Sequence, residues 1–377
     1  MNGPRRIVCI HPNAELYGSD RMFLETLRAI REVMPDARLD VHLPEEGPLT
    51  LEASRYASRV EHGGLTVLRK ASGLGLIRQA LALPAAIRTA MKRVKGADLV
   101  YISTLVLPAD IVASRFTRIP TLIHVHEIPG KFARVVFSML IMTARAGLIH
   151  ISEAVKNALS WTGAKDNVVI PNGVEPIKLS DTRKEGGVCN FLLIGRFNGW
   201  KGQPLLLDAV AMLDSSRRSR CRVRLVGSVY GDQHHFREAI EAAIRDHGLS
   251  DIVEILPFQP DPAACYDWAD VVVVPSLTPE PFGLVAIEGM SGARAVIAAD
   301  HGGLADIVDH GTTGLLCKPA SALALSEAMA RYIEEPGLAE RHGKAGRDRF
   351  SQLYDAEIYR KNIGKLMMQT IGCAKHA

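Results

Sequence analysis

The sequence predicts an α/β protein with two domains, each built from a parallel β-sheet wrapped by helices. Short apolar runs of strand type alternate with helical runs from one end of the chain to the other, which is the pattern of parallel sheets. At 377 residues the chain exceeds what one hydrophobic core usually organises. Its 47% hydrophobic and 23% charged residues are typical of a globular protein, which argues against disorder.

The expected elements follow this alternation in order. In the first half we expect strands at residues 6–11, 39–43, 99–103, 121–126 and 148–151, and helices at 21–34, 74–94 and 131–146. The second half repeats the pattern, with strands at 190–195, 222–227, 253–257, 271–275 and 295–298 and helices at 205–213 and 283–290. Residues 172–187 are polar and end in glycine, as a domain boundary does. Two such domains place the active site in the cleft between them, at the carboxyl ends of the strands.

Two glutamates flank the most informative junction. Glu280 follows a run of valines that is typical of a strand buried on both faces, and Gly283 then opens an apolar helical segment that carries Glu288. The free N–H groups and the positive dipole end of that helix favour a diphosphate. Glu288 lies farther along, where a carboxylate can accept hydrogen bonds from sugar hydroxyls. The junction therefore suits a sugar nucleotide.

Positive charge is expected near this junction. Arg196 follows one predicted strand, and Lys201 stands at the start of a helical run, so both can point to the cleft above a pyrophosphate. Gly195 and Gly202 would let the backbone approach a ligand closely, although both can equally serve only as turn residues. The pattern indicates a site for a phosphorylated ligand.

Five segments in order resemble those of retaining glycosyltransferases of family four, the glycosyl transferases group 1, which have the GT-B fold. They are the Asn-Gly-Val turn at 169–174, the Gly-Arg and Lys-Gly segment at 193–202, the glutamate pair at 280–288, and the glycine loops at 300–308 and 311–316. The resemblance covers the C-terminal half well and the N-terminal half loosely. It implies two Rossmann-like domains, an acceptor-side domain at 1–175 and a nucleotide-sugar domain at 176–350, with a final helix in 351–377 packing back on the first.

The resemblance also implies an activity and a set of site residues. A sugar would pass, with retention, from a UDP- or GDP-linked donor to a glycan or lipid-linked acceptor, in surface polysaccharide assembly. It assigns Glu280 to the donor sugar, Glu288 to the ribose, and Arg196, Lys201 and the Gly283 amide to the leaving diphosphate. The full expected set is catalytic His126, Glu280, Arg196 and Lys201, and donor-binding Gly18, Gly195, Arg196, Lys201, Phe282, Gly283, Leu284 and Glu288. No Asp-x-Asp occurs in the sequence, so no metal and no cofactor are expected.

In the first half the resemblance rests on a loop and a histidine. Residues 16–21 resemble the Gly-Gly-Ser-Glu loop of the family, but Tyr17 replaces the first glycine and Asp20 replaces glutamate. Ser19 or Asp20 as N-cap of the following helix is an equally good interpretation. His126, at a strand end before Glu127, resembles the histidine of the family's sugar cleft. His124 is the competing choice.

Charge is distributed unevenly along the chain. Residues 1–172 hold 22 Lys and Arg against 15 Asp and Glu, whereas the remainder holds 23 against 26. The basic amphipathic run at 74–95 could lie on an anionic membrane or be a core helix with a solvated face, and Pro84 should bend or divide it. The apolar run at 131–145 is expected to be buried. With no spanning segment, no signal peptide and no Cys-x-x-Cys pair, we expect a cytoplasmic protein, at most peripheral to the membrane, whose cysteines are reduced thiols.

Other functions remain as alternatives. A glycosidase could use two carboxylates, but residues eight apart on one junction are poorly placed to flank an anomeric carbon. A sugar-nucleotide epimerase or phosphorylase could use the same cleft, as could a noncatalytic nucleotide-sugar-binding protein. A nicotinamide enzyme is disfavoured because no Gly-x-Gly-x-x-Gly follows the first strand. Nucleic-acid binding has only the modest basic surplus in its favour.

Overall fold

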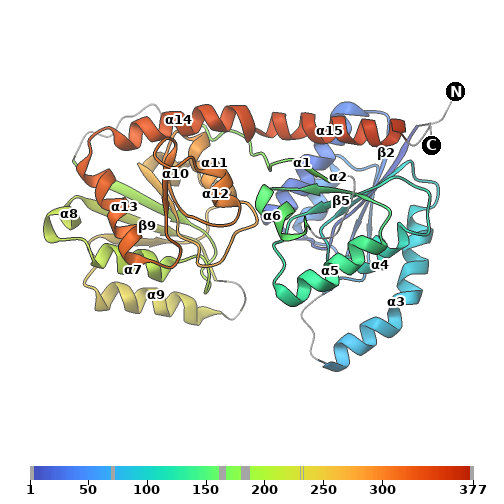
Figure 1. Ribbon diagram of the computed structural model, residues 1–377, viewed down its shortest axis with the longest axis horizontal. Helices are drawn as coiled ribbons and strands as arrows, with labels where there is room; N and C mark the ends of the chain where they lie inside the picture. Colours follow the sequence, from blue (N-terminus) through green and yellow to red (C-terminus); the bar gives the residue numbers. More distant parts are fainter. Residues whose placement is uncertain are drawn as a thin grey trace. The chain divides into compact units, whose positions relative to one another are not determined.

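The computed structural model describes residues 4–68, 73–160, 167–179, 187–229, 231 and 233–373. Its contacts divide the chain into two compact units. Unit 1 comprises Met1–Asn172 and Ala356–Ala377, and unit 2 comprises Gly173–Asp355. Each unit is a parallel sheet with helices on its faces (Figure 1), so the predicted α/β class is confirmed.

Unit 1 contains a seven-stranded sheet in the order β3-β2-β1-β4-β5-β6-β7. Its strands are β1 Arg6–Ile10, β2 Arg38–Leu43, β3 Arg59–His62, β4 Leu99–Ser103, β5 Thr121–Val125, β6 Gly147–His150 and β7 Asn167–Val169. Its helices are α1 Gly18–Val33, α2 Pro48–Ser54, α3 Gly73–Val94, α4 Pro108–Ala113, α5 Lys131–Thr143, α6 Glu153–Ala158 and α15 Ala356–Cys373. The central strands β4 and β5 are buried at every position, because helices cover both faces of a parallel sheet.

The last helix of the chain completes unit 1 by packing on α1. The Thr26 hydroxyl lies 2.6 Å from the Tyr359 hydroxyl, and both side chains are buried. Arg360 adds an ion pair to Glu25 at 2.7 Å. Residues more than 330 positions apart therefore share one interface within this unit.

Unit 2 contains a six-stranded sheet in the order β10-β9-β8-β11-β12-β13. Its strands are β8 Cys189–Ile194, β9 Cys221–Val226, β10 Val253–Leu256, β11 Val271–Val274, β12 Ala295–Ala299 and β13 Gly314–Cys317. Its helices are α7 Gln203–Ala211, α8 Ser215–Ser219, α9 His234–Asp246, α10 Ala263–Trp268, α11 Leu284–Ser291, α12 Gly303–Ile307, α13 Ala322–Glu334 and α14 Leu338–Leu353. The main core lies between the sheet and helices α7, α9 and α13.

The expected strands all occur, with bounds within one or two residues of the prediction. Three short strands were missed: β3, which is polar at its ends and lies at the sheet edge, the edge strand β7, and β13, which lies within a glycine loop. Helix α3 continues through Pro84 as one helix and is bent in Figure 1, so the proline bends the helix without dividing it. No helix among the described residues is long and apolar enough to cross a membrane.

The surface differs from the prediction at α5. Four of its apolar side chains, Phe132, Val135, Met139 and Met142, are exposed, whereas Phe137 and Ile141 on the opposite side are buried. The expectation that the whole run is buried is therefore wrong. A helix at the periphery of a sheet buries one side only, so the second apolar side of α5 faces solvent.

Candidate functional site

The predicted donor residues other than Gly18, which begins α1 in unit 1, lie where the strand order of unit 2 reverses. Strand β8 pairs with β9 on one side and with β11 on the other, so the loops that follow β8 and β11 leave the sheet next to each other at this reversal. Ligands of open α/β sheets bind at such a reversal, outside the carboxyl ends of the strands. The loop at 195–202 and the loop at 275–283 form this edge.

The loop after β8 is held by its own side chains and by the loop after β11. The Asn198 carboxamide oxygen accepts hydrogen bonds from the N–H groups of Trp200 and Lys201, at 3.1 and 3.0 Å. Gly202 has a φ of 82°, and a Cβ there would lie 2.3 Å from the carbonyl oxygen of Pro275. Only glycine permits this approach, which sets the position of Lys201.

Lys201 and Glu280 form an ion pair at the centre of this edge. The Lys201 Nζ lies 2.7 Å from the Glu280 Oε1, with 17% and 7% of the two side chains exposed. The Ser276 hydroxyl donates a short hydrogen bond to the same carboxylate oxygen. The resemblance assigned Lys201 to the diphosphate and Glu280 to the sugar, and the structure joins the two side chains directly.

Arg196 and Gly195 lie in the same loop. The backbone carbonyl of Arg196 accepts a hydrogen bond from the Gln203 side-chain amide at 3.0 Å, and Gln203 is fully buried at the start of α7. A Cβ at Gly195 would lie 3.5 Å from the Cδ of Lys201, so the lysine side chain crosses this glycine. The loop after β8 therefore carries both predicted cations.

The loop after β11 ends at helix α11. Gly283 has a φ of 129°, and a Cβ there would come within 2.5 Å of the Leu304 side chain. It precedes Leu284, the first residue of α11. The Ala286 N–H of this first turn donates to the Gly283 carbonyl oxygen at 3.0 Å, which leaves the N–H groups of Leu284 and Val285 without a partner within the helix. Phe282 is buried and lies edge-on to Tyr354, with ring centroids 6.0 Å apart. The Phe282 side chain thus anchors the loop by packing on Tyr354.

Glu288 is held on the same helix. Its carboxylate accepts a hydrogen bond from the Tyr266 hydroxyl at 2.7 Å, and the glutamate is nearly buried. Tyr266 comes from α10, which precedes β11. The carboxylate therefore has a defined orientation, as a residue that recognises a specific hydroxyl pair requires.

Three polar residues of this edge were missed by the sequence reasoning. They are Ser276, Tyr266 and His301, whose ring Nε2 lies 2.8 Å from the Ser276 carbonyl oxygen. Each belongs to a different loop or helix, and only Ser276 is close to Glu280 in sequence. Ser276 was recoverable because it follows a buried strand directly, whereas nothing in the sequence singled out Tyr266.

In unit 1 the loop after β1 holds a histidine–aspartate pair. The His11 Nε2 lies 2.7 Å from the Asp20 Oδ1, and both side chains are buried. The Tyr17 N–H donates to the other Asp20 oxygen at 2.8 Å. Tyr17 occupies the N-cap position of α1, so Ser19 and Asp20 are not N-caps but first-turn residues beside Gly18. Asp20 still satisfies a backbone N–H at this helix start, as an acidic residue in the first turn does.

His126 follows β5 directly. Its Nε2 is buried and has no hydrogen-bond partner among the described residues, and its ring lies 4.2 Å from that of His124. Burial, with a smaller contribution from nearby His11, lowers the pKa of His126 to about 3. His124 is fully buried and bonded to the Tyr101 hydroxyl at 2.7 Å. The Nε2 of His124 also has no hydrogen-bond partner among the described residues, so a free ring nitrogen does not distinguish the two histidines. His124 is the core histidine because it is fully buried on β5, whereas His126 is partly exposed at the end of the strand.

The contribution of His126 to the stability of unit 1 is expected to fall as pH drops from about 6.5 toward 3. The unfolded chain takes up a proton at the ordinary histidine pKa of 6.5, whereas folded His126 resists protonation down to about 3, so acid favours unfolding by up to about 1.4 kcal/mol per pH unit. Burial raises the pKa of Glu127 from 4.5 to about 7. The folded state therefore takes up this proton before the unfolded state does, and through Glu127 acid stabilises the fold between pH 7 and 4.5. Thermal unfolding between pH 4.5 and 6.5 should respond less to acid in His126→Gln and more in Glu127→Gln. Parallel profiles for both variants and the wild type would contradict this assignment.

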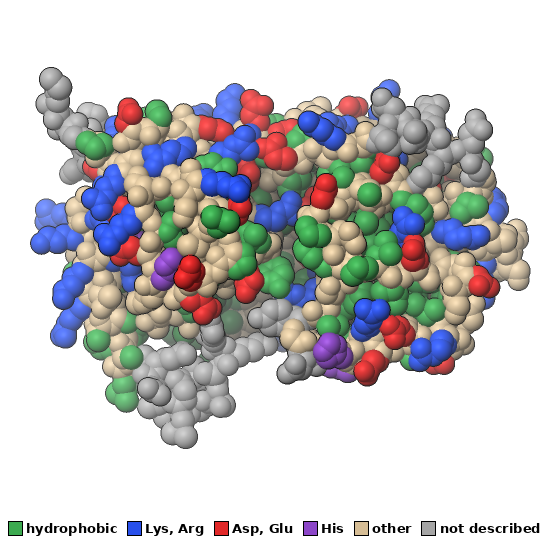
Figure 2. All heavy atoms as spheres, turned by 180° about the vertical axis from the view of Figure 1, so that it is seen from behind, with side chains coloured by type: hydrophobic (Ala, Val, Ile, Leu, Met, Phe, Trp, Pro, Cys, Tyr) green, Lys and Arg blue, Asp and Glu red, His purple; other side chains and the backbone are tan. Residues whose placement is uncertain are grey.

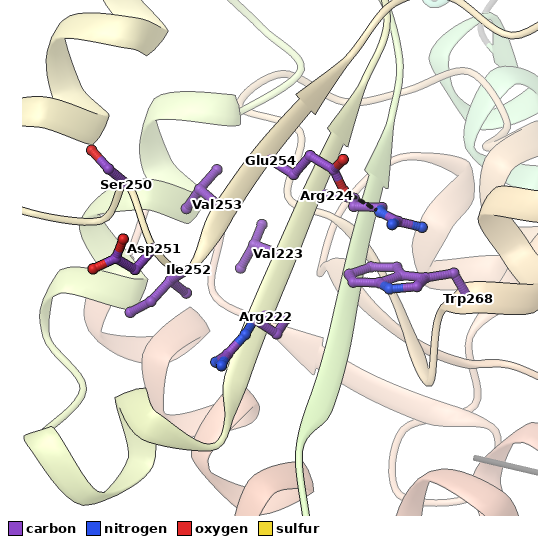
Figure 3. Close-up of a pocket in the computed structure, with 9 residues that line it drawn as sticks. All are labelled: Arg222, Val223, Arg224, Ser250, Asp251, Ile252, Val253, Glu254 and Trp268. Atoms are coloured by element: carbon purple, nitrogen blue, oxygen red, sulfur yellow. Dashed lines mark hydrogen bonds and ion pairs between the residues drawn. The ribbon is translucent and has the colours of Figure 1, made fainter. Parts of the chain in front are cut away.

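A separate cavity lies on the outer strands of unit 2 (Figure 3). It has a volume of about 340 Å³ and is lined by residues of β9, the start of β10 and the end of α10. Figure 3 shows the Arg224 guanidinium above the indole of Trp268, at 4.1 Å from its centroid, and the ion pair of 2.6 Å to Glu254. None of the predicted donor residues lines it, and two of its charged residues, Arg224 and Glu254, pair with each other.

Comparison with known proteins supports the resemblance. Residues 179–349 match the family described as glycosyl transferases group 1. The chain is 29% identical to glycogen synthase of Mycobacterium tuberculosis over 201 residues, which cover 51% of this chain and 46% of that protein. It is 37% identical to D-inositol 3-phosphate glycosyltransferase of Frankia alni over 150 residues, which cover 38% and 37%. The match thus spans half or less of the length of these relatives.

The fold is shared over nearly the whole chain with a solved structure. Anabaena Alr3699/HepE in complex with UDP superposes with a TM-score of 0.80 at 23% identity, covering 97% of this chain and 100% of that one. The same protein in complex with UDP-glucose has a TM-score of 0.79. Two parallel sheets in sequence, each with a helix-covered face and a strand-order reversal, are therefore those of the GT-B fold. Residues 179–349 therefore match the family of glycosyl transferases group 1, within a chain that has the GT-B fold.

Proposed function

We propose that this protein is a retaining glycosyltransferase that moves a sugar from a UDP- or GDP-linked donor to a glycan or lipid-linked acceptor. The observation that carries the proposal is the ion pair of Lys201 with Glu280 at the strand-order reversal of unit 2, beside the N-terminus of α11. A partly buried cation, a buried carboxylate and the first N–H groups of a helix at one edge match the charges of a sugar diphosphate. A simple hydrolase would have no use for this cation.

In this proposal the donor diphosphate replaces Glu280 as the partner of Lys201. Phosphate oxygens carry more charge than a carboxylate, and they gain negative charge as the bond to the sugar breaks, so Lys201, Arg196 and the amides after Gly283 stabilise the leaving group. The released Glu280 is then available to the donor sugar. Glu288, held by Tyr266, accepts hydrogen bonds from the ribose.

Retention requires the acceptor to attack from the side on which the diphosphate leaves. We assign the acceptor proton to the departing phosphate, and the bond from the sugar carbon to the phosphate oxygen breaks as the bond to the acceptor oxygen forms. His126 is neutral at pH 7 because of its lowered pKa, so it serves as a hydrogen-bond partner for a sugar hydroxyl and not as a cation. This account uses no metal ion.

The donor and the setting are further parts of the proposal. Anabaena HepE is described in complexes with UDP and UDP-glucose, which makes UDP sugars the first donors to test. We place the acceptor in surface polysaccharide assembly and the protein at the inner face of the membrane, in peripheral contact with anionic lipid. The basic excess of residues 1–172 supports this placement.

A thermal-shift screen with UDP- and GDP-sugars tests the donor site. The wild type is expected to melt at a higher temperature with its donor, since a ligand at about 100 times its Kd stabilises by about 2.7 kcal/mol. Arg196→Ala should lose most of the shift. Arg237→Ala is the matched control, because Arg237 is exposed on α9 of the same unit and pairs with Glu241.

Transfer assays with membrane extracts then test the reaction. Product formed at an unchanged rate in the presence of a chelator is expected from a metal-independent enzyme. Loss of transfer to the chelator at equal donor concentration would contradict it. Donor hydrolysis or epimerisation without any acceptor would instead support the epimerase or phosphorylase alternative, and binding without turnover would support a noncatalytic nucleotide-sugar-binding protein.

A further inference from the structure

The exposed side of helix α5 is an apolar stripe. Phe132, Val135, Met139 and Met142 follow one another at spacings of three and four residues, so they lie on one side of the helix, and between 44% and 82% of each is exposed. Exposed Lys131 and Arg145 stand at its two ends. A contiguous apolar surface of this kind on a folded domain marks a binding surface.

A groove with basic walls lies on α3 and the segment before β5. Its volume is about 490 Å³, and its cations are Arg88, Lys92, Lys95 and Arg118. Met91 and Ile119 supply apolar surface between them, and none of its lining residues is acidic. The groove therefore offers positive charge and apolar surface to one ligand.

The stripe and the groove belong to one continuous layer of helices. Helix α3 packs on α4 through the ion pair of Arg93 with Asp110, and α4 packs on α5. The Ser114 hydroxyl after α4 accepts the Arg145 N–H at 3.2 Å. Phe116, which is 64% exposed, lies in the sequence between Ser114 and the groove residue Arg118. Figure 1 shows the three helices following one another along the same side of unit 1.

This layer has a strong excess of positive charge. Residues 81–145 contain nine Lys and Arg against three Asp and Glu. Asp110 is buried in its pair with Arg93, and burial raises the pKa of Glu127 to about 7, which leaves Asp98 as the one exposed acid of this segment. On the face shown in Figure 2, Lys and Arg side chains also crowd the edge of unit 1.

We propose that this layer, the stripe of α5 together with the groove of α3, rests on an acidic phospholipid bilayer. Phe132, Met139 and Met142 would enter the boundary between headgroups and acyl chains, and the cations of the groove would meet lipid phosphates. A second copy of this chain is disfavoured as the occupant because it would present the same positive charge. The inference deepens the proposed function, since it names the surface that brings the enzyme to a lipid-linked acceptor.

Cosedimentation with vesicles tests the proposal on the full chain. Binding to vesicles of phosphatidylcholine with phosphatidylglycerol should exceed binding to phosphatidylcholine alone, and should weaken as salt is added. Phe132→Ser with Met139→Ser, and separately Lys92→Glu with Arg118→Glu, should each weaken binding about tenfold or more. The matched controls are Leu51→Ser, an apolar residue 70% exposed on α2, and Arg237→Glu with Arg331→Glu, which make the same charge change on unit 2.

The outcomes separate this proposal from the donor-site proposal. All variants should keep the melting temperature and the donor-induced shift of the wild type, because none of these residues lies at the edge formed by Lys201 and Glu280. Equal binding to both kinds of vesicle, or equal losses in the variants and controls, would overturn the membrane surface while leaving the donor site intact. A concentration-dependent mass that Phe132→Ser with Met139→Ser abolishes would identify a second copy as the occupant and would also overturn it.

Discussion

Replacing Lys201 with methionine is expected to lower kcat for sugar transfer about 10²–10³-fold, the loss that follows removal of one group aimed at developing negative charge. Methionine keeps the length and the apolar stem of the side chain and removes the cation that lies 2.7 Å from Glu280. Single-turnover release of the nucleotide diphosphate measures the chemical step. Lys344→Met, at an exposed position on α14, is the control, and equal activity in both variants would show that Lys201 does not act on the leaving group.

Lys201→Met is also expected to destabilise the fold, and adding Glu280→Gln separates this effect from the loss of activity. Without Lys201 the nearly buried Glu280 carboxylate keeps Ser276 as its remaining side-chain partner, so Lys201→Met should lower the free energy of unfolding by about 3 kcal/mol, the lower end of the range for a broken buried pair. The double variant Lys201→Met with Glu280→Gln should recover much of this stability. It should recover no activity, which distinguishes loss of charge at the site from loss of folded protein.

Gly202→Ala is expected to be strongly destabilising at the donor site. Its φ of 82° costs an alanine about 1–2 kcal/mol, and the added Cβ would lie 2.3 Å from the Pro275 carbonyl oxygen, which adds an overpacking cost of about 1–3 kcal/mol. We expect the unfolding midpoint of unit 2 in urea to fall accordingly. The donor-induced thermal shift should fall as well, because the loop that carries Lys201 must move.

Gly248→Ala separates the two costs. Gly248 also has a positive φ, of 63°, but a Cβ there meets nothing within 4 Å. It should therefore show the backbone cost alone, of about 1–2 kcal/mol, and keep the donor response. If both glycine variants were destabilised equally, the approach of the two loops at Pro275 would not be what requires Gly202.

Much of the fold could be predicted from the pattern of residue types within short segments. The strand at 271–274 is four consecutive valines, which only a strand buried on both faces accommodates so readily. Strand β13 was missed because it is four residues long and opens with Gly314, at a site where a Cβ would lie 2.2 Å from the carbonyl oxygen of Val296. The sequence shows a glycine loop there, and the partner strand that requires the glycine is 18 residues away.

In the loop after β1, too, the sequence predicted one part of the structure and missed another. A loop with Gly18 and Asp20 followed by a helix was predictable, but the helix begins earlier than expected, with Tyr17 at its N-cap position. Asp20 is not the N-cap residue. It lies in the first turn, where one carboxylate oxygen accepts the Tyr17 N–H and the other contacts His11. His11 is nine residues away and was not among the predicted site residues.

The sequence by itself determined the α/β class, the order of the elements and the segments that carry the chemistry, because periodicity, glycine spacing and charge are properties of neighbouring residues. Tertiary structure alone decided which of those groups meet. It paired Lys201 with Glu280 across 79 positions, placed Tyr266 on Glu288, and turned one apolar side of α5 to solvent. Such contacts depend on which strands become neighbours in the sheet and on which side of a helix finds a partner, and neither is encoded within a short window of sequence.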